Sequence, residues 1–234
     1  MWVSPRFQMA LGVLAGLLTL GAGFGALYWL LAPERFPVSQ VELKGNLRHT
    51  TRAEIEAALP RAGGNFFAAD LSEVRAGVER LPWVRRVAVR RVWPGRLELR
   101  IEEHVALARW SDDRLVNVHG ELFSAKSKEG LPTLVAPAGT SAEVARRYRR
   151  FAEIVAPLDA KIDRVVLSPR HAWQLRLANG QQLMLGRDID AAEARLRQFV
   201  EIYPRKFDQK RHEYVDLRYP NGFALRVPDP KSGS

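Results

Sequence analysis

The feature that most constrains this chain is a long uncharged run near its N-terminus, FQMALGVLAGLLTLGAGFGALYWLLAP, residues 7–33. Arg6 precedes the run and Glu34 follows it. At ~1.5 Å per helical residue such a run extends about 40 Å, which exceeds the ~30 Å of a bilayer's hydrocarbon core. We therefore expect a transmembrane helix over 7–33, preceded by a short tail of residues 1–6.

A cleaved signal peptide is the alternative reading of this run. Its apolar stretch is normally ~7–15 residues long and is followed by small residues at a cleavage site. Gly23-Phe24-Gly25 could serve as that site, but the apolar residues 27–31 continue directly after it. This continuation favours an uncleaved membrane anchor. The charges on the two flanks do not decide its orientation, because Arg6 lies on one side and Arg35 on the other.

The rest of the chain is long enough for one large domain or two small ones, each with a real core. The chain has 234 residues, no cysteine and a formal net charge of +10. The missing cysteines exclude disulfides, thiolate catalysis and cysteine-bound metals. The positive charge permits binding to nucleic acid, anionic lipid or an acidic partner, but the basic residues are scattered among acidic neighbours, which is typical of a solvated surface.

Residues 36–104 predict a small α+β unit. A strand around 41–43 is followed by two helix starts, Thr51-x-x-Glu54, which has the capping-box pattern, and Asp70-x-x-Glu73. After residue 82 the apolar period changes to two on both sides of Pro94-Gly95, a pair that suits a type II turn. The order strand, helix, helix, hairpin predicts two helices on one face of a three-stranded sheet.

Residues 105–227 predict a mixed β domain with flanking helices. One helix is expected after the capping pattern Thr140-x-x-Glu143, with Pro157 as its end, and a second is expected to close at Tyr203-Pro204. Asn179-Gly180 indicates a hairpin. The expected strands are 106–110, 115–118, 131–135, 165–167, 173–177, 183–185, 214–219 and 223–227.

Two groups of residues carry a family resemblance. The segments LPWV at 81–84, VAV at 87–89 and VWPGRLEL at 92–99 resemble a POTRA domain, a fold that binds polypeptide. One such domain after a single N-terminal helix, together with YVDLRYPNGFA at 214–224, resembles the FtsQ/DivIB family of bacterial cell division proteins. The resemblance implies a POTRA domain (β-α-α-β-β) at 36–104, a β domain at 105–227 and a C-terminal tail at 228–234. It also implies an inner-membrane scaffold of the division septum that helps regulate septal peptidoglycan synthesis, with residues 1–6 cytoplasmic and the domains periplasmic.

The sequence contains none of the catalytic motifs that we sought. The five histidines stand in no pattern with a serine elbow, and neither a zinc-binding HExxH motif nor a phosphate-binding glycine loop occurs. The pair Asp112-Asp113 is typical of a solvated turn. We therefore expect a non-enzymatic binding protein with no cofactor and no metal. Two other functions stay open at this stage: a membrane-anchored envelope enzyme such as a peptidoglycan hydrolase, and a basic module that binds a membrane surface or nucleic acid.

The last strand is the expected binding site. A strand close to the C-terminus tends to lie at a sheet edge, where it can accept a strand of another chain. Phe223, Leu225 and Val227 would share one face, and Ala224 and Arg226 the other. The resemblance implies that FtsB, bound with FtsL, docks here by strand addition and that no nucleic acid is bound. It also implies contacts of other division proteins with the POTRA domain and the membrane helix. The implied site is Tyr219, Asn221, Gly222, Phe223, Ala224, Leu225, Arg226 and Val227, with Arg170 as a candidate for an acidic contact.

Overall fold

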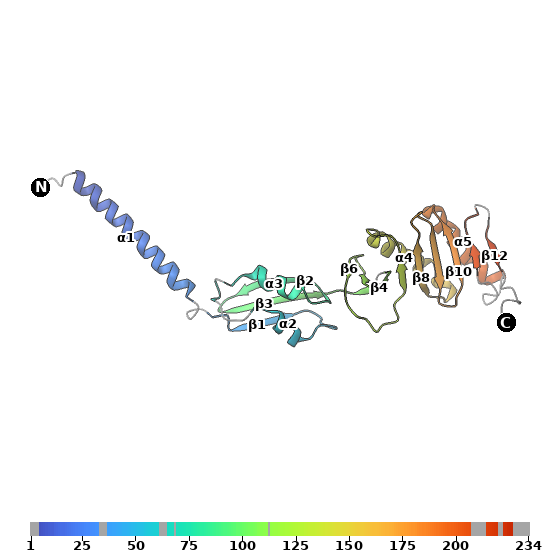
Figure 1. The fold of residues 1–234 in the computed structure, drawn as a ribbon, viewed down its shortest axis with the longest axis horizontal. Helices are drawn as coiled ribbons and strands as arrows, with labels where there is room; N and C mark the ends of the chain where they lie inside the picture. Colours follow the sequence, from blue (N-terminus) through green and yellow to red (C-terminus); the bar gives the residue numbers. More distant parts are fainter. Residues whose placement is uncertain are drawn as a thin grey trace. The chain divides into compact units, whose positions relative to one another are not determined.

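A computed structural model describes residues 5–32, 37–60, 65–67, 69–111, 113–206, 214–219 and 222–226. The chain divides into two compact units, Met1–Glu103 and His104–Ser234 (Figure 1). The first combines a long helix with a small α+β domain, and the second is built on a large mixed sheet. The expected α+β class is confirmed. The expected C-terminal tail 228–234 lies outside the described residues, as do residues 1–4 of the N-terminal tail.

The uncharged run forms one helix, α1 (Pro5–Leu31). Its segment Leu11–Trp29 is long and apolar enough to cross a membrane, and it is the single such helix among the described residues. Large apolar side chains project from it into open space, among them Leu18 and Phe24. Such exposure is unfavourable in water and favourable in lipid, which is consistent with a membrane-spanning helix.

The α+β domain of the first unit has the expected order of elements. They are β1 (Gln40–Lys44), α2 (Arg52–Ala58), α3 (Leu71–Glu79), β2 (Val84–Val92) and β3 (Arg96–Glu103). The sheet order is β1-β3-β2, with β1 parallel and β2 antiparallel to the central β3. Apolar residues of the helices and the sheet form one core, namely Ile55, Val74, Val78, Val84, Val87, Leu97, Leu99 and Ile101.

The helix starts and the hairpin turn that the sequence predicts in this domain are confirmed, and the structure adds one feature. Thr51 and Glu54 form a complete capping box at the start of α2. The Asp70 side chain accepts the first backbone N–H groups of α3. Gly95 has the positive φ of +71° expected for the hairpin turn, and the peptide bond between Trp93 and Pro94 is cis, which the sequence did not predict.

The second unit carries a nine-stranded sheet of order β12-β11-β10-β9-β8-β7-β4-β5-β6. Its first four strands along the chain are β4 (Ala106–Trp110), β5 (Leu115–Asn117), β6 (Leu122–Phe123) and β7 (Thr133–Val135). Then come β8 (Ile162–Leu167), β9 (Trp173–Leu177), β10 (Gln182–Gly186), β11 (Tyr214–Asp216) and β12 (Ala224–Arg226).

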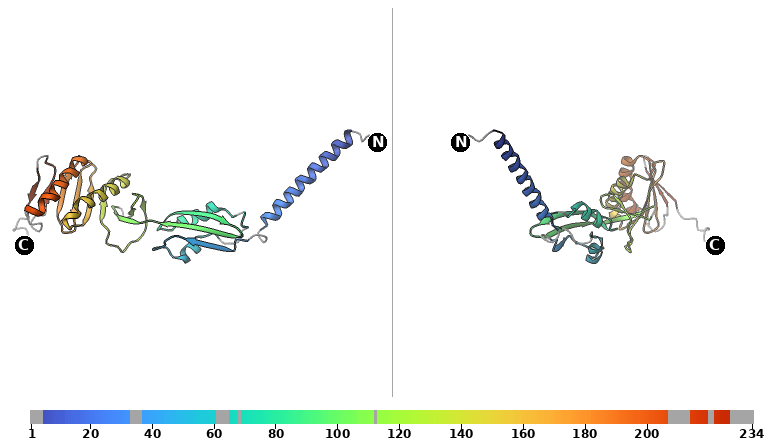
Figure 2. Two further views of the ribbon diagram at one scale, coloured as in Figure 1. Left: turned by 180° about the vertical axis from the view of Figure 1, so that it is seen from behind. Right: turned by 60° about the vertical axis from the view of Figure 1, so that its left-hand side comes forward.

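Two helices cover one face of this sheet, as the left view of Figure 2 shows. They are α4 (Ser141–Val155), which contacts β5 and β8, and α5 (Ile189–Lys206), which contacts β10. A short 3₁₀ helix, η1 (Ala156–Leu158), follows α4. The other face is open, as the alternating burial of β9 shows. Residues 173, 175 and 177 of this strand are buried, and Arg176 is exposed.

Three local expectations differ from the structure. Thr140 makes no side-chain cap for α4, and its hydroxyl instead donates to the Pro137 carbonyl at 2.7 Å. Helix α5 continues past Tyr203 to Lys206. The strand expected at 214–219 ends at Asp216 as β11, where its register with β10 ends, and Leu217 N makes one further bond, to the Met184 carbonyl of β10 at 2.9 Å.

Candidate functional site

Strand β12 is one edge of the nine-stranded sheet, as the sequence predicts, and β6 is the other. It pairs antiparallel with β11, so that Ala224 lies opposite Asp216, Leu225 opposite Val215, and Arg226 opposite Tyr214. Its other side has no neighbouring strand within the described part of the chain. An edge strand of this kind presents backbone donors and acceptors to an incoming strand.

The two faces of β12 differ as the alternation predicts. Phe223 and Leu225 pack against the core of the second unit, and the ring of Phe223 meets that of Phe199 on α5 edge to face, with centroids 5.2 Å apart. Ala224 and Arg226 are exposed on the open face of the sheet. Leu225 therefore anchors the strand, while Ala224 and Arg226 are available to a partner. Val227 lies outside the described residues.

The segment between β11 and β12 contributes two more of the expected residues. The Tyr219 side chain, between β11 and β12 in the chain, is 56% exposed. A side chain added at Gly222 would meet no atom within 4 Å, so this position faces open space. Asn221 lies outside the described residues. Tyr219 thus offers an aromatic surface beside the edge strand, a residue type enriched at the energetic centres of interfaces.

An acid–base pair beside the edge went unpredicted. Asp216 is buried, and Arg218 binds it in a fork, with Nε 2.9 Å from Oδ1 and Nη2 2.5 Å from Oδ2. This hydrogen bonding by Arg218 lowers the pKa of the Asp216 carboxyl below its ordinary value and raises that of Arg218. The Arg218 chain lies over Gly186, and Arg195 of α5 donates to the Leu217 carbonyl.

These contacts give the segment after β11 a defined path. The signal for the pair was present in the sequence, because an aspartate side chain often accepts from the backbone N–H two residues further on, as Asp216 Oδ1 does from Arg218 N at 3.0 Å. Arg195 could not be found in this way, since its acceptor is a backbone carbonyl far along the chain.

Arg170 lies at the same end of the sheet but not at the edge. It is exposed in the hairpin between β8 and β9, where His171 N donates to the Ser168 carbonyl at 2.9 Å. Trp173 at the start of β9 pairs with Gly186 at the end of β10, and β10 runs parallel to β11. Arg170 and Arg218 therefore belong to one end of the sheet, while β9 and β12 are three strand spacings apart, ~14 Å at ~4.8 Å each. A partner that contacts both must extend across this end.

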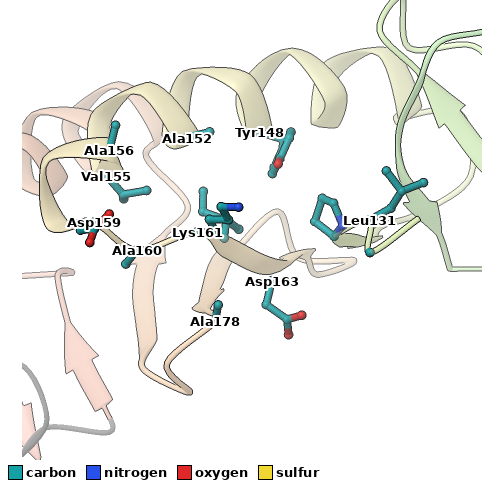
Figure 3. A pocket seen from close by; sticks show the side chains of 13 residues that line it. Leu131, Tyr148, Ala152, Val155, Ala156, Asp159, Ala160, Lys161, Asp163 and Ala178 are labelled. Atoms are coloured by element: carbon teal, nitrogen blue, oxygen red, sulfur yellow. The ribbon is translucent and has the colours of Figure 1, made fainter. Parts of the chain in front are cut away.

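A cavity of about 660 Å³ lies elsewhere in the second unit, between α4, the start of β8 and residues 130–132 (Figure 3). Tyr148 points into it from α4, and burial raises the pKa of its hydroxyl, which keeps the ring neutral. Asp163 pairs with Arg176. Lys161 and Asp159 complete the ionisable lining, and the remaining described lining residues are alanines, glycine, proline and aliphatic side chains. These residues do not form a nucleophile–base pair.

Metal ligation has no support among the residues that the structure describes, where no group of three or more histidine, cysteine or acidic side chains gathers. Within the same ranges, every buried side-chain nitrogen or oxygen has a hydrogen-bond partner. Among the expected site residues, those that the structure brings together lie at the β12 edge and in the segment before it.

Comparison with known proteins identifies two families along the chain. Residues 36–104 match "POTRA domain, FtsQ-type", and residues 108–218 match "Cell division protein FtsQ/DivIB, C-terminal". A curated cell division protein FtsQ from Burkholderia pseudomallei is 40% identical, with 97% of this chain and 94% of that protein covered. The FtsQ of Nitrosospira multiformis is 39% identical (91% and 92% covered), and that of Escherichia coli 35% (88% and 78%).

Proposed function

This chain belongs to the FtsQ/DivIB family of bacterial cell division proteins, and we propose that it is a non-enzymatic scaffold that recruits FtsB and FtsL to the septum through β12. The observation that carries the proposal is the edge strand itself. Among the described residues no strand pairs with its outer side, and its exposed face combines the small Ala224 with the cation Arg226.

Strand addition suits this edge for two physical reasons. Backbone pairing with β12 supplies affinity in any sequence context, and the alternate side chains supply selectivity. Ala224 leaves room above Asp216 on the open face, while Arg226 and the exposed Tyr219 supply charge and aromatic area at the two ends of the strand. An incoming strand with an acidic residue near Arg226 would complement this surface.

Arg170 extends the proposed interface beyond β12. Because it lies about three strands from the edge at the same end of the sheet, a partner reaches both only with a second segment beyond its paired strand. We assign Arg170 an acidic contact with that second segment. The proposal places the two domains in the periplasm, held to the inner membrane by α1, with the N-terminus in the cytoplasm.

Other division proteins would use the first unit. A groove of about 680 Å³ follows the outer edge of the small sheet, lined by Leu71, Ser72, Arg75 and Glu79 of α3 and by residues 86–89 of β2. Since β2 is an edge strand beside this groove, an extended segment could pair with its backbone and contact the lining side chains, provided that it displaces Glu79, whose Oε1 accepts from Val87 N at 3.0 Å.

The decisive test uses exposed residues, because Leu225 packs into the core and its replacement would also disturb folding. Tyr219→Glu and Arg226→Glu are introduced into the full chain, and copurification of the FtsB–FtsL pair is quantified. We expect each to lower the affinity at least ~10-fold, as for a central aromatic or a complementary charge of an interface. Arg149→Glu on the exposed side of α4 is the matched charge reversal and should bind normally.

Binding of both edge variants within twofold of the native chain would overturn the β12 assignment. The cellular role is tested separately by depletion of the protein in its host. Filamentous cells without septa are expected, and normal division would contradict a role as a division scaffold whatever the binding experiment shows.

A further inference from the structure

We infer that the hairpin end of the small α+β domain inserts aromatic side chains into the surface of the membrane that α1 spans. The feature is a group of three rings, here called the aromatic tip: Phe66, Phe67 and Trp93. The ring centroids of Phe66 and Phe67 lie 5.2 Å apart, and each lies 6.1 Å from that of Trp93.

The tip is exposed where a soluble domain would normally bury such residues. Trp93 is 61% exposed and Phe67 38%, whereas Phe66 beneath them is 4% exposed. Each of the two outer rings therefore has one side packed on the domain and another directed outward. Tryptophan is enriched at membrane–water interfaces, where an indole ring places its apolar body in lipid and its N–H among headgroups, and the neighbouring phenylalanine adds apolar area.

The fold holds the tip in a fixed shape. Arg91 of β2 donates from Nε to the Phe66 carbonyl at 2.8 Å and from Nη2 to the Ala69 carbonyl at 2.5 Å. These bonds fasten the segment that carries Phe66 and Phe67 to the hairpin that carries Trp93. Because the rings are already ordered, insertion would cost little additional conformational entropy.

The chain brings the tip to the end of the membrane helix. Ser39 N donates to the Gly95 carbonyl at 2.8 Å, and Pro37 forms a bridge with Asn65, so the first residues after the linker lie on the hairpin end of the sheet. Four linker residues separate Pro37 from Ala32, a span of at most ~18 Å. Asn65 also donates from Nδ2 to the Ala32 carbonyl at 2.8 Å.

Asn65 thereby joins three parts of this region. Its side chain binds the chain just after α1, its backbone segment bridges Pro37, and its Oδ1 accepts from Phe67 N at 2.8 Å. The candidate membrane segment ends at Trp29, only three residues before Ala32. An aromatic group tied to that point lies at the height of the interface, so the lipid surface is the occupant that the covalent geometry favours.

Photo-crosslinking of the full chain tests this inference. The aromatic ketone p-benzoylphenylalanine replaces Trp93 in one variant and Trp83 in the other, and each is reconstituted into phosphatidylethanolamine–phosphatidylglycerol vesicles without other proteins. Trp83 precedes β2 at the opposite end of the strand, which makes it the matched control. We expect at least ~10-fold more phospholipid adduct at position 93. Equal yields, or adducts mainly to other copies of the chain, would overturn the inference.

A second measurement begins with all aromatic side chains in place and then removes one of them. The chain has no cysteine, so Ser39→Cys and Asn46→Cys each give a single nitroxide site, at the tip end and beyond the far end of β1. In the same vesicles, the relaxation of each label by oxygen, which concentrates in lipid, is divided by its relaxation by a nickel complex, which stays in water. We expect this ratio to be several-fold higher at position 39 than at position 46. The difference between the two positions should disappear when Trp93→Glu is added. Equal ratios of oxygen to nickel relaxation at 39 and 46 with the native tip would refute membrane contact.

Discussion

In the small sheet β1 is paired with β3 from Gln40 to Lys44, and β2 continues its pairing from Val84 to Val92, whereas in the large sheet β12 is paired with β11 only from Ala224 to Arg226. In both sheets, helices cover one face and the other face is open. The long ladders hold the first pair of edges firmly, while β12 depends on a short register and on packing beneath it. Edges of similar topology can therefore differ in how readily they adapt to a partner.

Buried carboxylates on the open faces show the same contrast. Glu98 of the central β3 has a side chain only 4% exposed, with Lys44 Nζ 2.8 Å and Arg90 Nη2 2.7 Å from its Oε2. It thus links β1 and β2 across β3. Asp216 instead binds Arg218 of its own segment. The first carboxylate joins strands, and the second binds within the segment that follows β11.

The largest effects should come from the two cores. Phe199→Ala removes a fully buried ring that supports Phe223, and Leu99→Ala empties the centre of the small domain; such truncations cost about 3–5 and 2–5 kcal/mol respectively. Hydrogen exchange of the full chain in vesicles is the measurement. Phe199→Ala should accelerate exchange in β11 and β12, and Leu99→Ala in β1 to β3.

Each variant is the control for the other. The comparison of the two sheets requires that the effect of each truncation stays within its own unit. Acceleration of β1 to β3 by Phe199→Ala would show that the units unfold together and would remove the basis for treating β12 as a separately adaptable edge.

A smaller effect is expected from the Glu98 cluster and depends on pH. Hydrogen bonds from Arg90 and Lys44 lower the pKa of the Glu98 carboxyl to about 2, from an ordinary value of 4.5. A carboxyl with a lowered pKa adds stability that is complete above pH 4.5 and is lost as the pH falls toward 2. Thermal unfolding of the native chain and of Glu98→Gln is measured across this window. The stability of Glu98→Gln should fall less steeply with decreasing pH, because the variant lacks the one carboxyl that takes up a proton on unfolding.

The companion variant is Arg90→Gln, alone and combined with Glu98→Gln. Removing only the carboxylate leaves the Lys44 and Arg90 cations close together, so the double variant should recover part of the stability that Glu98→Gln loses. Equal pH slopes for the native chain and Glu98→Gln would contradict the role of Glu98 as the link between the two edges.

Sequence reasoning was most successful where the signal is local. The spacing of apolar residues, Pro82 and Asn179-Gly180 predicted most helices and strands, and the position of the last strand predicted an edge. Binding at that edge stays a prediction. The order of all nine strands was not predicted, because the parallel pairs β4–β7, β7–β8 and β10–β11 join segments whose contacts leave no local pattern.

The same limit explains what was missed around the site. Arg195 reaches the Leu217 carbonyl, and Arg91 fastens the segment of Phe66, through bonds between residues more than twenty positions apart. Such contacts depend on the fold and not on a neighbouring residue. Even a local pattern can mislead, since Thr51-x-x-Glu54 and Thr140-x-x-Glu143 are the same signal and only the first forms a capping box.

The smallest effects are expected at these two threonines. They distinguish a helix cap that forms from a sequence pattern that only resembles one. Thr51→Ala breaks the bond that Oγ1 accepts from Glu54 N and should cost the small domain about 1 kcal/mol. Thr140→Ala removes only a hydroxyl bond to the Pro137 carbonyl, which water can replace at this half-buried position, and should cost ~0.5 kcal/mol or less. Hydrogen exchange at the starts of α2 and α4 measures both. Equal losses of stability would mean that Thr140 does cap α4 in solution. The backbone at Thr140, with φ −101° and ψ 5°, would then have to adopt the extended form that Thr51 already has.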